Sequence, residues 1–202
     1  MVTENIKSRE IPLVLLKDFS TTHTITSLAK ELNMSRVGMW KLLKKLERDE
    51  LIKLEPIGKG KTSTYRISLN WDNLLVEKTL ALSLTQEALK HKRWRFNFEK
   101  LEKEVEFLIL FGSILHSPKR ANDVDILVVI EKKNLVNIGD LIVKIQVSQE
   151  KDIHSINFTK PEFKKELKKG NKAYAGAIKK GVILFGQESF INFMKEVHGY
   201  GN

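Results

Sequence analysis

The chain contains no cysteine, which excludes disulfide bonds, thiol chemistry and thiolate metal sites together. It also lacks any run of the roughly eighteen apolar residues that a membrane-spanning helix needs. Its first residues do not form the apolar core of a signal peptide. No internal repeat and no long low-complexity linker is present. We therefore expect a cytoplasmic protein with no membrane partner.

What the chain does have is an ordinary apolar content and an excess of positive charge. Its 202 residues are 42% hydrophobic and 30% charged, which suits one large or two small soluble domains. The net charge of +10 favours a polyanionic partner, above all nucleic acid. Because membrane surfaces are also anionic, charge alone does not decide the partner.

Two carboxylates, Asp123 and Asp125, stand one residue apart at the head of the apolar run 126–130. Side chains alternate along a strand, so both acids are expected on one face, roughly 7 Å apart, where they can hold divalent metal ions. A second apolar run, residues 106–111, ends at Gly112-Ser113. A turn of this kind lets backbone N–H groups face a phosphate.

Together these residues resemble the signature of the DNA polymerase beta-like nucleotidyltransferase superfamily, especially its minimal branch. The resemblance covers roughly residues 97–190, and Gly181 to Gly186 resembles the C-terminal strand common in that branch. It implies a mixed sheet with flanking helices. It also implies that Asp123 and Asp125 are catalytic and ligate Mg²⁺, and that Ser113 and the Gly112 backbone bind the β- and γ-phosphates of a nucleoside triphosphate. The alternative to metal binding is that Asp123 caps a turn and Asp125 is a charged residue on an edge strand.

The sequence departs from this family pattern in two places. The third carboxylate of active members is expected on the strand 152–158, where alignment on the following helix start places His154. Asp152 lies two residues earlier, hence on the same face, and would substitute if the strand slides. The usual Arg and Gly after Gly-Ser are also missing, which leaves Lys119 and Arg120 as alternative contacts for triphosphate. A catalytically degenerate domain is therefore an open alternative.

The sequence of the N-terminal third predicts three helices and a hairpin. Residues 11–16 and their flanks form the first helix, Thr26 caps the second, and Ser35 caps a third that ends near Arg48. The strands 51–54 and 64–69 flank flexible turn residues. Residues 24–52 resemble the winged helix-turn-helix DNA-binding domains of many prokaryotic regulators.

Helical spacing divides the third helix into an apolar and a basic side. The inward residues are Met39, Leu42, Leu43 and Leu46. The predicted DNA-binding residues are Arg36, Lys41, Lys44 and Lys45 of this helix, with Lys59 and Lys61 of the wing. A basic recognition helix suits phosphate and base contacts in a major groove, so we expect DNA in preference to RNA.

A long connecting helix is predicted from Trp71 to about Arg93. It contains too many leucines for a solvated linker, so it should pack on one or both domains or on a second copy of itself. Regulators with a winged helix often dimerise in this way, and a homodimer is therefore expected. The basic segment 90–95 either tracks a nucleic-acid backbone or marks a domain boundary.

Strands and helices alternate through the rest of the chain. Helices are expected at 134–148, 160–169, 171–180 and 189–198, with strands at 152–158 and 181–186. The fold class is thus α+β or α/β. The expected domains are a winged helix-turn-helix (1–70), a connecting helix with a basic linker (71–96), and a nucleotidyltransferase-like domain (97–202).

Three functions fit these features. The first is a nucleic-acid-binding protein that transfers a nucleoside monophosphate from a nucleoside triphosphate to a hydroxyl, with Mg²⁺. The second is a transcriptional regulator whose degenerate domain senses nucleotide or serves dimerisation. The third is an antitoxin-like enzyme that modifies a partner protein. The sequence does not separate them.

Overall fold

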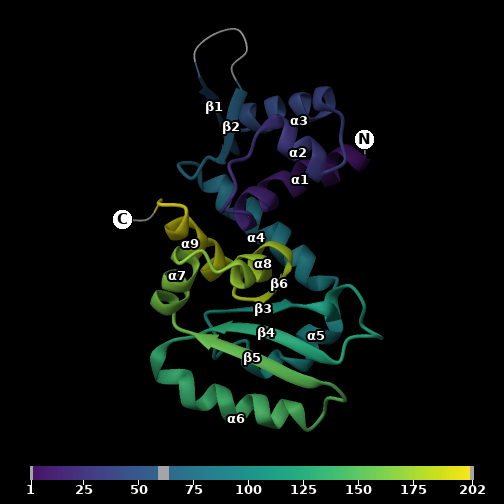
Figure 1. The fold of residues 1–202 in the computed structure, drawn as a ribbon, viewed down its shortest axis with the longest axis vertical. Coiled ribbons are helices and arrows are strands. Elements are labelled where there is room, and N and C mark those ends of the chain that lie inside the picture. Colours follow the sequence, from purple (N-terminus) through teal and green to yellow (C-terminus); the bar gives the residue numbers. More distant parts are fainter. Residues whose placement is uncertain (1, 59–63, 201–202) are drawn as a thin grey trace. The chain divides into compact units, whose positions relative to one another are not determined.

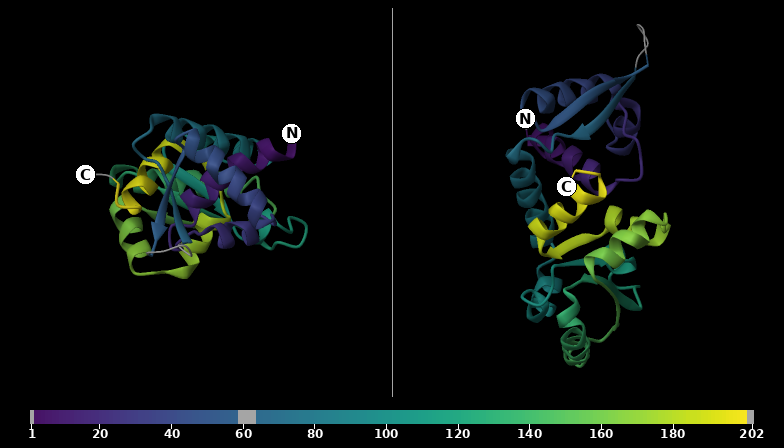
Figure 2. Two further views of the ribbon diagram at one scale, coloured as in Figure 1. Left: turned by 90° about the horizontal axis from the view of Figure 1, so that it is seen from above. Right: turned by 90° about the vertical axis from the view of Figure 1, so that its left-hand side faces the viewer.

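A computed structural model describes residues 2–58 and 64–200. The chain divides into two compact units, Met1–Ser83 and Leu84–Asn202, which are described separately. Figure 1 labels their helices and strands, and Figure 2 gives two further views. None of the helices in the described ranges is long and apolar enough to cross a membrane.

The first unit begins with three helices and continues with a two-stranded hairpin (Figure 1). The helices are α1 (Val2–Lys17), α2 (Ile25–Glu31) and α3 (Arg36–Arg48), and the strands are β1 (Ile52–Ile57) and β2 (Thr64–Leu69). The strands pair antiparallel, with Ile52 opposite Leu69 and Ile57 opposite Thr64. Lys59 and Lys61, two of the predicted DNA-binding residues, lie between the strands and outside the described residues.

Side chains fix where α2 and α3 begin. Thr24 caps α2, because its hydroxyl accepts from the Ser27 N–H at 3.2 Å while the Ser27 hydroxyl accepts from the Thr24 N–H at 2.8 Å. The predicted cap Thr26 is therefore wrong by two residues. Ser35 caps α3 as predicted, and its Oγ accepts from the Gly38 N–H at 3.0 Å.

The apolar side of α3 faces the core of the first unit. Its four predicted inward residues are all buried, namely Met39, Leu42, Leu43 and Leu46. Trp40 is half-buried and packs on the hairpin, where its ring centroid lies 5.4 Å from that of Tyr65. Trp40 is thus a packing residue in this unit.

The predicted helix from Trp71 to Arg93 is two helices, α4 (Leu74–Leu89) and α5 (Lys92–Asn97). α4 starts late because the Asn73 side chain accepts from the Leu75 N–H at 3.0 Å. It ends where the N–H groups of Lys90 and His91 bond to carbonyls only three residues back, which tightens the turn.

The second unit is built on a four-stranded mixed sheet with the order β5-β4-β3-β6. The strands are β3 (Phe107–Phe111), β4 (Asp123–Val129), β5 (Asp152–Phe158) and β6 (Val182–Phe185). β3 runs antiparallel to β4 and β6, whereas β4 and β5 are parallel. This mixed α+β architecture agrees with the fold class predicted for this part of the chain.

Helices cover both faces of this sheet. They are α6 (Leu135–Gln146), α7 (Lys160–Lys168), α8 (Lys172–Lys180) and α9 (Gln187–Val197), with short 3₁₀ turns η1 (Glu99–Leu101), η2 (Ser113–Leu115) and η3 (Lys132–Asn134). One face packs its apolar strand residues on α5 and α6, through buried Trp94, Ile138 and Ile145. On the other face Phe107 contacts Phe163 of α7 and Phe193 of α9, which with α8 lie on the opposite side in Figure 1.

Candidate active site

The register of the sheet gathers acidic and basic side chains where β4 and β5 begin. Asp123 lies beside Asp152 and Asp125 lies beside His154 on the parallel neighbour β5. On the other side, Asp125 pairs with Phe111 at the end of β3. Because side chains alternate along a strand, all four polar groups belong to one face of the sheet. The register alone therefore leaves both Asp152 and His154 as candidates for the third group of the site.

The Gly112-Ser113 turn follows β3 directly and lies against Asp125. Gly112 has φ +81°, a conformation that favours glycine, and a Cβ placed on it would lie 2.0 Å from Asp125 Oδ2. Ser113 is exposed and begins η2. Glycine thus lets the backbone approach the carboxylate closely, with a solvent-accessible hydroxyl next to it.

His154, and not Asp152, turns toward the paired acids. Its Nδ1 lies 3.3 Å from Asp123 Oδ2 and 3.7 Å from Asp125 Oδ1. One ligand atom from each of these three residues lies within 4.8 Å of the other two, so they can hold a metal ion. Asp152 is exposed and is not part of this group. Of the two residues proposed for the third position, the structure brings His154 to the site.

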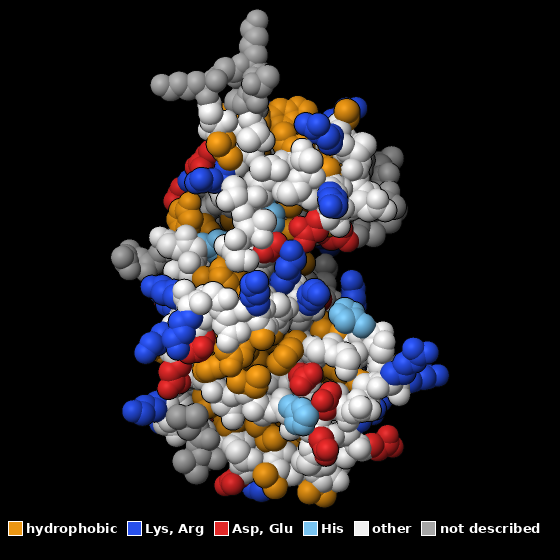
Figure 3. All heavy atoms as spheres, in the orientation of Figure 1, with side chains coloured by type: hydrophobic (Ala, Val, Ile, Leu, Met, Phe, Trp, Pro, Cys, Tyr) orange, Lys and Arg blue, Asp and Glu red, His pale blue; other side chains and the backbone are white. Residues whose placement is uncertain are grey.

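The three side chains remain open to solvent. They are exposed by 32% for Asp123, 27% for Asp125 and 61% for His154. In the space-filling view, acidic side chains and a histidine gather beside a hydrophobic area on a face of the second unit (Figure 3). These groups are therefore accessible from solvent.

The surroundings of Asp125 oppose its ionisation. Partial burial raises the pKa of the Asp125 carboxyl, and the neighbouring Asp123 charge raises it further, while His154 lowers it. Two carboxylates held this close repel each other. A bound divalent cation would relieve that repulsion, and two carboxylates with one imidazole form a suitable donor set for such an ion.

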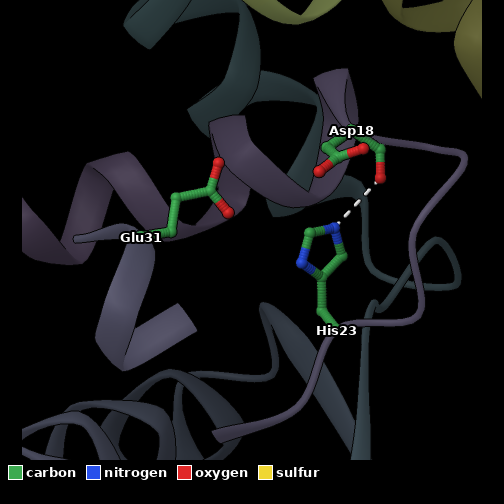
Figure 4. Close-up of side chains that lie close together, drawn as sticks. All are labelled: Asp18, His23 and Glu31. Atoms are coloured by element: carbon green, nitrogen blue, oxygen red, sulfur yellow. Dashed lines mark hydrogen bonds between the residues drawn. The ribbon is translucent and has the colours of Figure 1, made fainter. Parts of the chain in front are cut away.

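A second group with metal-ligand potential, Asp18, His23 and Glu31, lies in the first unit (Figure 4). The His23 Nε2–H donates to the Asp18 backbone carbonyl at 3.0 Å, which leaves the ring proton on Nε2 because a carbonyl only accepts. Nδ1 of His23 has no hydrogen-bond partner in the described part of the chain. His23 is buried, with 4% of its surface exposed. Asp18 and His23 are buried, and their hydrogen bond connects the loop before α2 to the end of α1.

The family model described as "Polymerase beta, Nucleotidyltransferase" matches residues 97–175. The match supports a resemblance of this segment to nucleotidyltransferase domains. The match spans β3, the Gly112-Ser113 turn, β4 and β5, which are the elements that build the site. Members of this family typically use a divalent metal, in agreement with the group of acidic residues found here. Searches of curated proteins and of solved structures gave no match.

The remaining predicted residues lie on exposed segments of both units. Lys119 and Arg120, after the Gly112-Ser113 turn, are exposed. On α3, Arg36, Lys41 and Lys45 are exposed as well. Lys44 is half-buried, because its Nζ pairs with Glu47 at 2.7 Å and lies 4.8 Å from the centre of the Trp40 ring. Sequence patterns gave no signal for the His23 group, which depends on the tertiary structure.

Proposed function

We propose that the second unit transfers a nucleoside monophosphate from a nucleoside triphosphate to a hydroxyl acceptor on a nucleic acid or a partner protein. The reaction releases pyrophosphate and uses a divalent cation, for which the family resemblance implies Mg²⁺. The observation that carries this proposal is the convergence of Asp123 and Asp125 beside Gly112, inside the segment that matches the nucleotidyltransferase family.

Each residue of the site has a role in this reaction. Asp123 and Asp125 hold the cation, which when bound neutralises charge on the phosphates. The Gly112-Ser113 turn offers backbone N–H groups and a hydroxyl to the β- and γ-phosphates. The acceptor oxygen forms a bond to the α-phosphorus, the bond from that phosphorus to pyrophosphate breaks, and the hydroxyl proton passes to solvent. Catalysis then consists of positioning and charge neutralisation.

The test is transfer of label from α-labelled ATP or CTP in the presence of Mg²⁺ or Mn²⁺. Asp123→Ala and Asp125→Ala should abolish labelling. Asp152→Ala is the matched control, because Asp152 is the β5 neighbour of Asp123 but lies outside the convergent group. Labelling that is equal in wild type and in both active-site variants would refute the proposal.

We propose further that the first unit is a winged helix-turn-helix that binds DNA through α3. Three helices followed by an antiparallel hairpin support this. So do the exposed cations Lys41 and Lys45 on the side of α3 opposite its buried residues, with exposed Arg36 at the margin of that side. Lys44 contributes less, because Glu47 already neutralises it.

A second candidate function is a regulator whose second unit senses nucleotide without turnover. The observation that favours it is His154 at the position where the resemblance implies a third carboxylate. In that case a nucleoside triphosphate would bind and change the affinity of the protein for DNA, while no label would be transferred to any acceptor.

We also propose a homodimer that forms through α4. Leu75, Leu82 and Leu89 are spaced by seven residues and are 61%, 54% and 48% exposed. Leucines at this spacing form one stripe along a helix and pack well against a second copy. Leu82→Lys should convert the dimer to a monomer in light scattering, whereas an unchanged mass would exclude this interface.

A further inference from the structure

The third group of the candidate active site is an imidazole where the family resemblance implies a carboxylate. The parallel register between β4 and β5 places His154 beside Asp125, on the face that carries both acids. Asp152, the acid that would have restored an all-oxygen site, is exposed and outside the group of convergent ligand atoms. An imidazole in place of a carboxylate changes the chemistry of the site.

The distances agree with a shared metal ion. Two ligand atoms that bind one metal at about 2.1 Å lie about 3.0 Å apart at octahedral angles and about 3.4 Å apart at tetrahedral angles. The two separations from His154 Nδ1, 3.3 Å to Asp123 and 3.7 Å to Asp125, are close to these values. Small side-chain rotations are therefore enough for all three residues to bind one ion.

Nitrogen and oxygen donors select different ions. Mg²⁺ is a hard cation that binds oxygen and keeps much of its water, so an imidazole contributes little to its binding. Imidazole suits ions of the transition series, and Mn²⁺ is the member of that series that is also well suited by carboxylate. A site with two carboxylates and one imidazole should therefore favour Mn²⁺ over Mg²⁺.

We propose that His154 Nδ1 is a direct metal ligand and makes this site selective for Mn²⁺ over Mg²⁺. The inference rests on the proposed function only in placing the metal at Asp123 and Asp125, and it concerns which ion is bound rather than which reaction follows. His154 is mostly exposed, so its substitution leaves the sheet intact.

The experiment is a titration of the full chain with Mn²⁺ alone, followed by electron paramagnetic resonance, with Mg²⁺ added as a competitor. His154→Ala should weaken Mn²⁺ binding by at least about tenfold, the loss that even indirect metal partners produce. His154→Asp, which offers a third carboxylate, should recover Mn²⁺ binding and improve competition by Mg²⁺, so that the selectivity ratio falls about tenfold. Asp152→Asn, a change on the same strand and face, should leave the ratio of Mn²⁺ to Mg²⁺ affinity unchanged.

A spectroscopic signature separates ligation from simple ion pairing. Pulsed electron paramagnetic resonance of the Mn²⁺-loaded wild type should show coupling between Mn²⁺ and an imidazole nitrogen. The His154→Ala substitution should remove this coupling. Absence of that coupling, or an equal Mn²⁺-to-Mg²⁺ ratio in wild type and His154→Asp, would overturn the inference. Intact coupling without nucleotide transfer under either metal would instead refute the proposed function and leave this inference standing.

Discussion

Gly112 and Asp125 are so close that no other residue fits at position 112. A Cβ there would lie 2.0 Å from Asp125 Oδ2 and 3.0 Å from its Cγ, and the φ of +81° already favours glycine. In the proposed site, the turn that binds phosphate therefore lies directly against the carboxylate that binds the metal. Any displacement of one displaces the other.

Gly112→Ala should abolish nucleotide and metal binding and destabilise the fold by about 1–3 kcal/mol, because it combines backbone strain with a steric clash. Gly170→Ala is the matched control, since Gly170 also has a positive φ, +74°, but open space around its Cα. Thermal unfolding and metal titration check both variants. Retention of metal binding in Gly112→Ala would contradict the described contact.

Asp125→Asn should raise the melting temperature of the metal-free protein at pH 7. The pKa of Asp125 is raised in the folded state by burial and by Asp123, so the folded state holds the proton more tightly than the unfolded state. The free energy of unfolding therefore falls as the pH rises from the unfolded-state pKa to the folded-state pKa of Asp125. Above both pKa values, the ionised Asp125 carboxylate destabilises the folded state. Thermal unfolding with a chelator should show the gain at pH 7 and its loss below about pH 4. A lower melting temperature for Asp125→Asn at pH 7 would contradict this.

Glu106 should stabilise the second unit with the opposite pH dependence. Its carboxylate accepts from Lys160 and from Ser189, each at 2.8 Å, and the Lys160 bond is the main cause that lowers the pKa of Glu106. A lowered pKa gives stability that is present above the ordinary Glu value and lost as the pH falls through the folded-state pKa. Glu106→Gln should therefore cost about 0.5–1 kcal/mol at pH 7 and little in acid.

The control for this change is Glu196→Gln, which removes a more exposed pair with Lys164 and should cost less. Urea unfolding at several pH values measures both variants. The expectation fails if the difference in free energy of unfolding between Glu106→Gln and wild type is the same at pH 3 and pH 7.

Lys41→Ala and Lys45→Ala should each weaken DNA binding and reduce the slope of log affinity against log salt by about 0.9 for every phosphate that the lysine neutralises. Lys30→Ala is the control, because Lys30 is an exposed lysine of the same unit that lies on α2. Fluorescence anisotropy with duplex DNA over a range of salt concentrations measures these slopes. Equal slopes for all three variants would argue against α3 as the DNA-binding element.

The strands that carry the candidate site were predicted where local pattern decides the structure. The two apolar runs form β3 and β4, and alternation placed both acids on one face, because period and polarity are local properties. The sequence did not decide between Asp152 and His154. Both lie on the same face of β5, each beside one of the acids, and only the side-chain positions in the folded structure show that His154 turns to them.

Other errors have similar causes. Thr24 and Thr26 are both good caps, and the deciding partner is Ser27, three residues after Thr24. The connecting helix was predicted too long because an Asn73 cap and a tight turn at Lys90 interrupt an otherwise helical pattern. The burial of His23 has no local signal, because burial of a single polar loop residue depends on contacts distant in sequence.

The most direct test of the central claim is calorimetric titration of the protein with ATP, with and without a divalent cation. Wild type should bind ATP only when the cation is present, since the acids repel the bare triphosphate and attract its metal complex. Asp125→Asn should lose most of that metal-dependent binding. ATP binding that is unaffected by the cation, or equal in wild type and Asp125→Asn, would contradict a metal-bound triphosphate at Asp123, Asp125 and Gly112-Ser113.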